Sequence, residues 1–217
     1  MAESAVTVMP PVARSPIAPA GGATVVDGWE RATRPTRAVL RLCDLSFLAK
    51  VQVRGPRQGS AGELLGAPMG RAARQGSRLV VGGGPGEWLV LGPQGQGDAI
   101  VAELGDRLAG TGGLVSVVDL THGRALMRLT GDAAVTGVLS KLCAVNLSDR
   151  AAPDGTALRS SVASLVTDVV RDDRDGQRSF LLHCERSSGQ YLFDALLDAG
   201  ADQGIEAYAA TDTDKDW

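Results

Sequence analysis

The sequence predicts an α+β protein built from two copies of one unit. Two observations carry this prediction. Asp119-Leu120-Thr121 repeats Asp44-Leu45-Ser46, and the strand pattern at 126–131 repeats the one at 50–55. In both stretches a buried strand, a sharp bend and a second strand precede an amphipathic helix. We therefore expect two strand-strand-helix-strand-strand-helix units whose helices and strands pack in layers.

The first unit shows the expected elements in order. Ser60-Ala-Gly-Glu63 has the spacing of a capping box and predicts a short helix, which Pro68 ends. A second helix is expected from about residue 98, because Ile100, Leu104 and Leu108 fall on one helical face. Four strands are expected, at 37–44, 50–54, 78–81 and 87–91.

The second unit repeats this order. A helix is expected after Asp132, where apolar residues recur at helical spacing through Leu142. Ser187 and Gln190 suggest a capping box for the last helix, and Gly200 stands where its C-terminal cap belongs. The expected strands are 115–119, 124–131, 162–170, 179–184 and a closing edge strand at 205–208.

The chain divides into three regions. Residues 37–209 form the duplicated domain, with halves at about 37–113 and 114–209, and residues 210–217 form an acidic tail. Residues 1–36 contain five prolines, so no regular element is expected before residue 37. This arm is either disordered or laid across a partner surface, where Ile17, Val25, Val26 and Trp29 would be buried.

Composition excludes several classes of protein. Hydrophobic residues make up 44% of the 217 and charged residues 22%, which is typical of a globular domain. A net charge of -3 argues against a nucleic-acid-binding protein. The sequence shows neither a membrane span nor a signal peptide, so we expect a cytoplasmic protein. Cys43, Cys143 and Cys184 are expected to be buried thiols rather than a disulfide or zinc framework.

Three segments have compositions that could form a binding site. Residues 82–86 are rich in glycine but lack the Lys-Ser/Thr of a phosphate loop, which favours a turn. Residues 184–189 favour a helix cap over an anion site, and residues 171–175 a charged turn over a calcium loop.

The bend at residues 119–124 is the other candidate site. Asp119 and His122 could be a base and its orienting group beside Arg124, although a turn or interface role is favoured. His183 is expected to be a hydrogen-bonded core residue. Two classes of function remain open on the residues: a binding or assembly subunit, and an enzyme with a pocket between the repeats.

Several motifs together resemble the gamma subunit of heterotetrameric sarcosine oxidase. They are Arg14-Ser-Pro-Ile17, Asp44-Leu-Ser46 with Val53-Arg-Gly-Pro56, Gly86-Glu-Trp-Leu-Val90, Val118-Asp-Leu-Thr-His-Gly-Arg124 and His183-Cys-Glu-Arg-Ser-Ser-Gly-Gln-Tyr-Leu192. That family is similar in fold to the folate-binding domain of the glycine-cleavage T-protein, an aminomethyltransferase. The resemblance thus implies an aminomethyltransferase-like fold made of duplicated α+β halves.

The resemblance also implies partners. The family works in a complex of alpha, beta, gamma and delta subunits that demethylates sarcosine to glycine, passes the one-carbon unit to tetrahydrofolate and forms hydrogen peroxide. FAD, FMN and NAD belong to alpha and beta, and zinc to delta. We therefore expect a non-catalytic assembly subunit with no catalytic, cofactor-binding or metal-ligating residues, whose arm contacts the large subunits. The alternative is a free-standing folate-dependent one-carbon protein.

Overall fold

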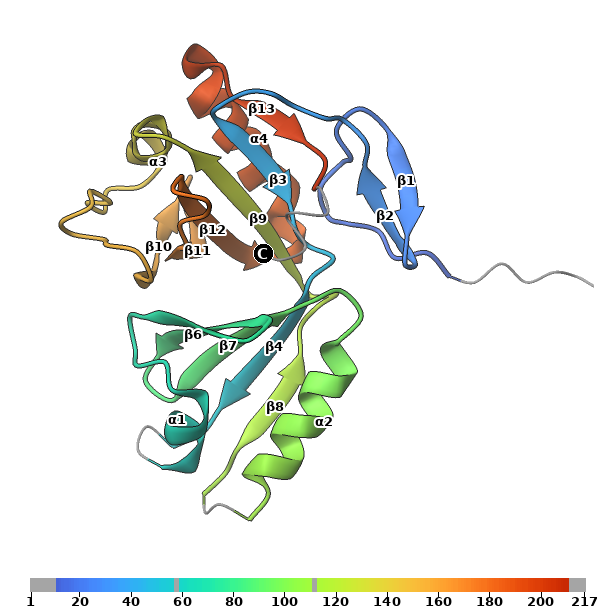
Figure 1. The fold of residues 1–217 in the computed structure, drawn as a ribbon, viewed down its shortest axis with the longest axis vertical. Helices are drawn as coiled ribbons and strands as arrows, with labels where there is room; N and C mark the ends of the chain where they lie inside the picture. Colours follow the sequence, from blue (N-terminus) through green and yellow to red (C-terminus); the bar gives the residue numbers. More distant parts are fainter. Residues whose placement is uncertain (1–10, 57–58, 111–112, 211–217) are drawn as a thin grey trace, which may run out of the picture.

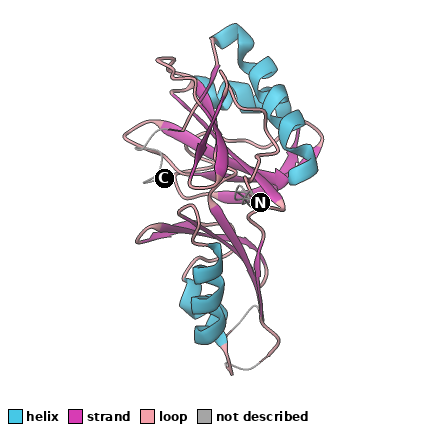
Figure 2. Ribbon diagram, turned by 90° about the vertical axis from the view of Figure 1, so that its right-hand side faces the viewer, coloured by secondary structure: helices cyan, strands magenta, loops and turns pink. Residues whose placement is uncertain are grey.

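The computed structural model describes residues 11–56, 59–110 and 113–210. These residues form two main β-sheets with helices on their outer sides (Figure 1). Figure 2 shows helices at the two ends of the molecule and strands between them. The duplicated α+β architecture expected from the sequence is confirmed.

Each unit contains one strand more than expected. The first unit runs β3 (Arg41–Asp44), β4 (Ala49–Arg54), α1 (Ser60–Leu65), β5 (Ala72–Gln75), β6 (Arg78–Gly84), β7 (Glu87–Gly92) and α2 (Gly97–Leu108). The second runs β8 (Ser116–Asp119), β9 (Arg124–Gly131), α3 (Ala134–Leu142), β10 (Ala157–Val162), β11 (Leu165–Arg171), β12 (Arg178–Glu185) and α4 (Gly189–Gly200). The expected closing strand is β13 (Glu206–Tyr208), which pairs in parallel with β3.

The two units exchange their first strands. One sheet has the order β10-β11-β12-β9-β3-β13, and the other has the order β5-β6-β7-β4-β8. β3 of the first unit therefore pairs with β9 of the second, and β8 of the second pairs with β4 of the first. Neither half of the chain completes its own sheet, which links their folding.

Three apolar clusters follow from the period of two in the strands. In β4, Ala49, Val51 and Val53 point to the outer core under α1 and α2. In β9, Ala125, Met127 and Leu129 point to the core under α3 and α4. Leu126, on the opposite face of β9, belongs to a third cluster between the two sheets, together with Leu89 of β7 and Leu181 of β12. The layers are therefore helices, sheet, sheet, helices.

The prediction of one strand over 162–170 was wrong. The chain forms a β10–β11 hairpin that turns at Ala163 and Ser164, whose φ values are 48° and 67°. Glycine usually fills such positions, so these residues carried no turn signal in the sequence. β5 was also missed.

The predicted helix caps were wrong in detail. α1 begins after Gly59 without a side-chain cap hydrogen bond. α4 is preceded by a 3-10 turn (Arg186–Ser188) and also lacks a side-chain cap. A second 3-10 turn (Ala201–Gln203) extends α4, so Gly204, rather than Gly200, takes the left-handed capping conformation.

The arm contains a β-hairpin, contrary to expectation. β1 (Ala23–Val26) and β2 (Trp29–Ala32) pair across a two-residue turn at Asp27 and Gly28, both with positive φ. Ile17 and Trp29 are buried against the same chain. These two residues therefore stabilise the body and are not exposed for a partner.

Candidate functional site

The repeated bends are the points where the chain crosses from one sheet to the other. Oδ1 of Asp44 accepts a hydrogen bond from the Ser46 amide at 2.9 Å, and Oδ1 of Asp119 accepts one from the Thr121 amide at 2.7 Å. These are matching Asx turns. The acid and hydroxyl of each repeat thus shape the bend, in keeping with the turn role that the internal repeat favours.

The two hydroxyl groups bind the opposite crossing strand in matching ways. Ser46 Oγ accepts a hydrogen bond from the Leu126 amide at 3.1 Å, and Thr121 Oγ1 accepts one from the Lys50 amide at 3.0 Å. Two backbone bonds complete the pattern: the Leu45 amide donates to Leu126, and the Leu120 amide to Lys50. Lys50 and Leu126 are equivalent in the repeat, so the junction has near two-fold symmetry.

Lys50 breaks this symmetry, because its counterpart is apolar. Its side chain is fully buried, and Nζ donates to the carbonyls of Ser46 at 2.7 Å and Leu48 at 2.8 Å. Burial lowers the pKa of Lys50 to about 7, against the opposing charges of Asp44 and Asp119. The amine therefore ties together two carbonyls of the bend at residues 44–49.

The remaining residues of the predicted site have structural partners. The His122 ring stacks on Trp29 at 4.9 Å between centroids, with an interplanar angle of 8°. Arg124 forms an ion pair with Glu185, and Arg186 donates to the carbonyls of His122 and Arg14. Asp119 and His122 therefore do not form a base and its orienter, and the segment at 184–189 joins arm to body.

A polar cleft lies between the sheets. On the inner face of β12, the apolar Leu181 is followed by the polar residues His183 and Glu185. On the inner face of β7, the charged residue Glu87 stands next to the apolar Leu89. Charged side chains separate the sheets here and leave a cavity of about 150 Å³. The cavity is lined by Gln52, Arg54, Glu87, Arg124, Arg159, Val166, Asp168, His183 and Glu185.

His183 is the most distinctive group in this cleft. Its Nδ1 lies 3.0 Å from Oδ2 of Asp168, and because a carboxylate only accepts, Nδ1 carries the proton. Burial lowers the pKa of His183, so the ring is neutral. Nε2 is then a buried acceptor, and it has no hydrogen-bond partner among the described residues.

Arg159 ties this pair to the other sheet. Its guanidinium group donates to Asp168 at 2.6 Å and to Glu87 at 2.6 Å. Burial raises the pKa of Asp168, but hydrogen bonds from His183 and Arg159 outweigh this effect and hold it below its usual range. Glu87 also pairs with Arg54 at 3.3 Å.

The cleft has one arrangement that chemistry could use. A histidine oriented by a carboxylate is the geometry of a general base. The other charged groups of the cleft pair with one another, and the described residues that line it include no hydroxyl or thiol nucleophile. The sequence placed His183 in the core correctly, but Asp168 and Arg159 gave no signal, because only strand pairing brings them to it.

The glycine-rich and charged candidate segments form turns. Residues 82–86 lie in the β6–β7 hairpin. The charged turn after β11 contains Asp172, which is buried and pairs with Arg74, Arg128 and Arg174. Asp172 is therefore the centre of an internal ion-pair network that links the end of β11 to β5 and β9.

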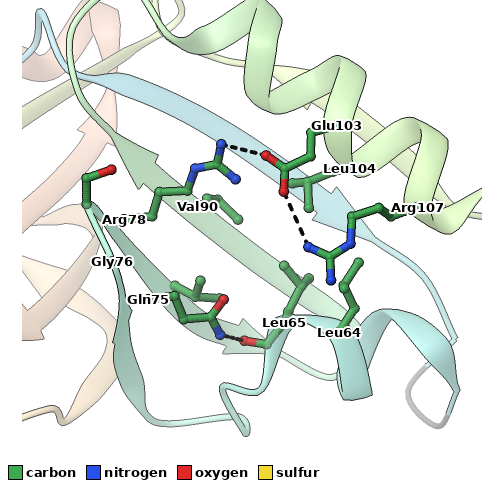
Figure 3. A pocket seen from close by; sticks show the side chains of 11 residues that line it. Leu64, Leu65, Gln75, Gly76, Arg78, Val90, Glu103, Leu104 and Arg107 are labelled. Atoms are coloured by element: carbon green, nitrogen blue, oxygen red, sulfur yellow. Dashed lines mark hydrogen bonds and ion pairs between the residues drawn. The ribbon is translucent and has the colours of Figure 1, made fainter.

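A second concavity lies on the outer face of the first-unit sheet, between α1 and α2 (Figure 3). Its volume is about 350 Å³, at the lower end of small-molecule sites. Glu103 joins Arg78 at 2.7 Å and Arg107 at 3.3 Å across it. Below them Leu65, Val80, Val90 and Leu104 are at most 3% exposed, so the apolar floor is nearly closed.

Cysteine, histidine and acidic side chains are the groups that could hold a metal. Cys43, Cys143 and Cys184 are buried and form no disulfide with one another, and burial raises the pKa of Cys184 to about 11. Among residues 11–56, 59–110 and 113–210, no three histidine, cysteine or acidic side chains gather as a metal would require. None of the described helices is long and apolar enough to span a membrane.

Comparison with known proteins identifies the fold. No protein-family model and no curated protein matches the sequence. Among solved structures, a chain of the heterotetrameric sarcosine oxidase from Corynebacterium sp. U-96 in complex with pyrrole 2-carboxylate matches with a TM-score of 0.63 and 24% identity, over 74% of this chain and 83% of that chain.

The glycine cleavage system aminomethyltransferase T from Bartonella henselae matches with a TM-score of 0.65 and 17% identity. That match covers 86% of this chain but only 55% of the aminomethyltransferase. The chain therefore has the fold shared by a chain of heterotetrameric sarcosine oxidase and by the aminomethyltransferase of glycine cleavage, as the sequence resemblance predicted.

Proposed function

We propose that this chain is the gamma subunit of a heterotetrameric sarcosine oxidase and acts in assembly rather than in chemistry. The observation that carries the proposal is the structural match to a chain of heterotetrameric sarcosine oxidase, which has a TM-score of 0.63 and covers 74% of this chain and 83% of that chain. The match to the aminomethyltransferase covers 55% of that protein.

The paired charges of the inter-sheet cleft support an assembly role. Arg159 and Arg54 balance the charges of Asp168 and Glu87, and Arg124 pairs with Glu185. A cavity of about 150 Å³ is smaller than the usual range of small-molecule sites. We assign no catalytic, cofactor-binding or metal-ligating residue to this chain.

The proposal assigns the cofactors and the chemistry to the other subunits. Alpha and beta subunits would hold FAD, FMN and NAD, delta would hold zinc, and the whole complex would demethylate sarcosine to glycine. This chain would contribute contact surface for the other subunits and a rigid support for the complex. A permanent subunit interface of this kind buries on the order of 2,000 Å² or more.

Coexpression tests the proposal. The full chain is produced alone and together with alpha, beta and delta subunits of a sarcosine oxidase. We expect a colourless protein alone and a yellow, peroxide-producing complex on coexpression. The matched control is the complex lacking this chain, which we expect in lower yield. Tight tetrahydrofolate binding by the isolated chain would instead support a folate-dependent one-carbon protein.

A further inference from the structure

The β1–β2 hairpin leaves one edge open. Figure 1 shows β1 as the outermost strand, with β2 between it and the rest of the molecule. Ala23, Thr24 and Val25 are exposed, and Val25 is 56% exposed. An apolar residue on an exposed strand edge is a feature that proteins usually cover or charge.

Turn geometry shows which backbone groups face this edge. Asp27 and Gly28 both have positive φ, as in a type I′ turn, so Val26 and Trp29 form the hydrogen-bonded pair next to it. Pairs alternate along an antiparallel ladder, so the next pair, Val25 and Glu30, is not hydrogen bonded. The N–H and C=O groups of Val25 therefore point outward.

The bonds of Glu30 confirm this assignment. As the cross-strand partner of Val25, it should use its backbone on the opposite edge, and its amide donates to the Ala13 carbonyl at 2.8 Å. The Ala13 amide donates to the Gly28 carbonyl at 2.8 Å. The outer edge of β2 is thus covered by the chain itself.

None of the described residues covers the outer edge of β1 in this way. Within the described ranges, no backbone hydrogen bond outside the hairpin ladder reaches Ala23 or Val25. A two-stranded hairpin is marginal in water, and an unpaired edge is a template for another strand. A partner that completes this edge must be an extended chain whose backbone places a hydrogen-bond donor and a hydrogen-bond acceptor opposite Val25.

We propose that an extended strand of a partner subunit pairs with β1 and turns the hairpin into a three-stranded sheet. This inference rests on the proposed function and specifies how the subunit docks. The partner strand carries a β-branched or aromatic side chain beside Val25, since such cross-strand pairs stabilise sheets. Ile17 and Trp29, buried against the body, hold the hairpin in place for this contact.

Two substitutions at one position test the pairing in the full chain coexpressed with alpha, beta and delta subunits. Val25→Pro removes the outward N–H, and since the β1–β2 ladder does not use that group, the hairpin remains. Val25→Thr keeps the N–H and serves as the matched control. We expect Val25→Pro to weaken assembly about tenfold, the equivalent of one lost hydrogen bond, and Val25→Thr to change it little.

Amide hydrogen exchange gives a readout that does not depend on a variant. In the isolated chain the Val25 amide should exchange rapidly while the Val26 amide is protected, and assembly should protect Val25. If the wild-type complex forms but Val25 stays unprotected and Val25→Pro assembles normally, strand pairing is wrong while the proposed function stands. If the wild-type chain does not assemble, the proposed function fails too. Self-association of the isolated chain through β1 would make a second copy the occupant and overturn the proposal.

Discussion

The hydroxyl groups of Ser46 and Thr121 stand at the two bends where the chain passes from one sheet to the other. Removing them tests whether the repeated residues stabilise the fold. Ser46→Ala removes the acceptor of the Leu126 amide, and Thr121→Val removes the acceptor of the Lys50 amide. Ser46 is fully buried and Thr121 is 8% exposed, so water cannot easily replace either hydroxyl. Both variants leave a buried backbone N–H without a partner.

The expected cost follows from that orphaned donor. Leaving a buried amide unpaired costs about 1–3 kcal/mol, so each variant should lose that much free energy of unfolding. The double variant should not be additive, because Lys50 joins both bends: its amide binds Thr121 and its Nζ binds the Ser46 carbonyl. Ser77→Ala, which removes an exposed hydroxyl, is the control and should change stability by less than about 0.5 kcal/mol.

Urea unfolding followed by circular dichroism measures the effect on the isolated chain, and peroxide formation measures it on the coexpressed complex. We expect lower unfolding midpoints and unchanged activity per assembled complex. Wild-type stability in both variants would contradict the hydrogen-bond account. Lost activity with unchanged stability would show that the repeated acid and hydroxyl serve catalysis.

Three further predictions concern other buried groups. Burial lowers the pKa of Lys50 from 10.5 to about 7, so between these values the unfolded chain binds more protons and stability rises with pH. We expect urea titrations to show a gain of roughly 3 kcal/mol from pH 6 to pH 9, and Lys50→Met to abolish it. Asp168→Asn should release His183 from its Nδ1–H tautomer, which nitrogen NMR shifts of the ring would report; an unchanged tautomer would contradict the assigned pair. Trp29→Ala should cost the isolated chain about 3–5 kcal/mol, whereas an arm that only meets a partner would lose nothing in urea unfolding.

The duplication was predictable from sequence because its signals are local. An Asx turn needs an acid and a residue two positions on, and both repeats contain them. The period of two in the strands likewise identified β4 and β9. The exchange of β3 and β8 was not predictable in this way, because alternation shows which face of a strand is buried but not which strand lies beside it.

The elements and contacts that the sequence did not predict have separate physical causes. Ala163 and Ser164 adopt positive φ without glycine, so the β10–β11 turn was hidden. The β1–β2 hairpin has a turn signal in Asp27-Gly28, but the five prolines of residues 1–36 argue against any regular element in the arm. The pairing of His183 with Asp168 depends on the register of β11 and β12, which only tertiary structure fixes.

Subunit composition of the coexpressed complex tests the central claim most directly. The chain, expressed with alpha, beta and delta subunits and purified through a tag on alpha, is analysed by native mass spectrometry. The account predicts one copy of this chain in each flavin-containing complex. A flavin-containing complex of the other three subunits, with this chain eluting separately, would contradict it.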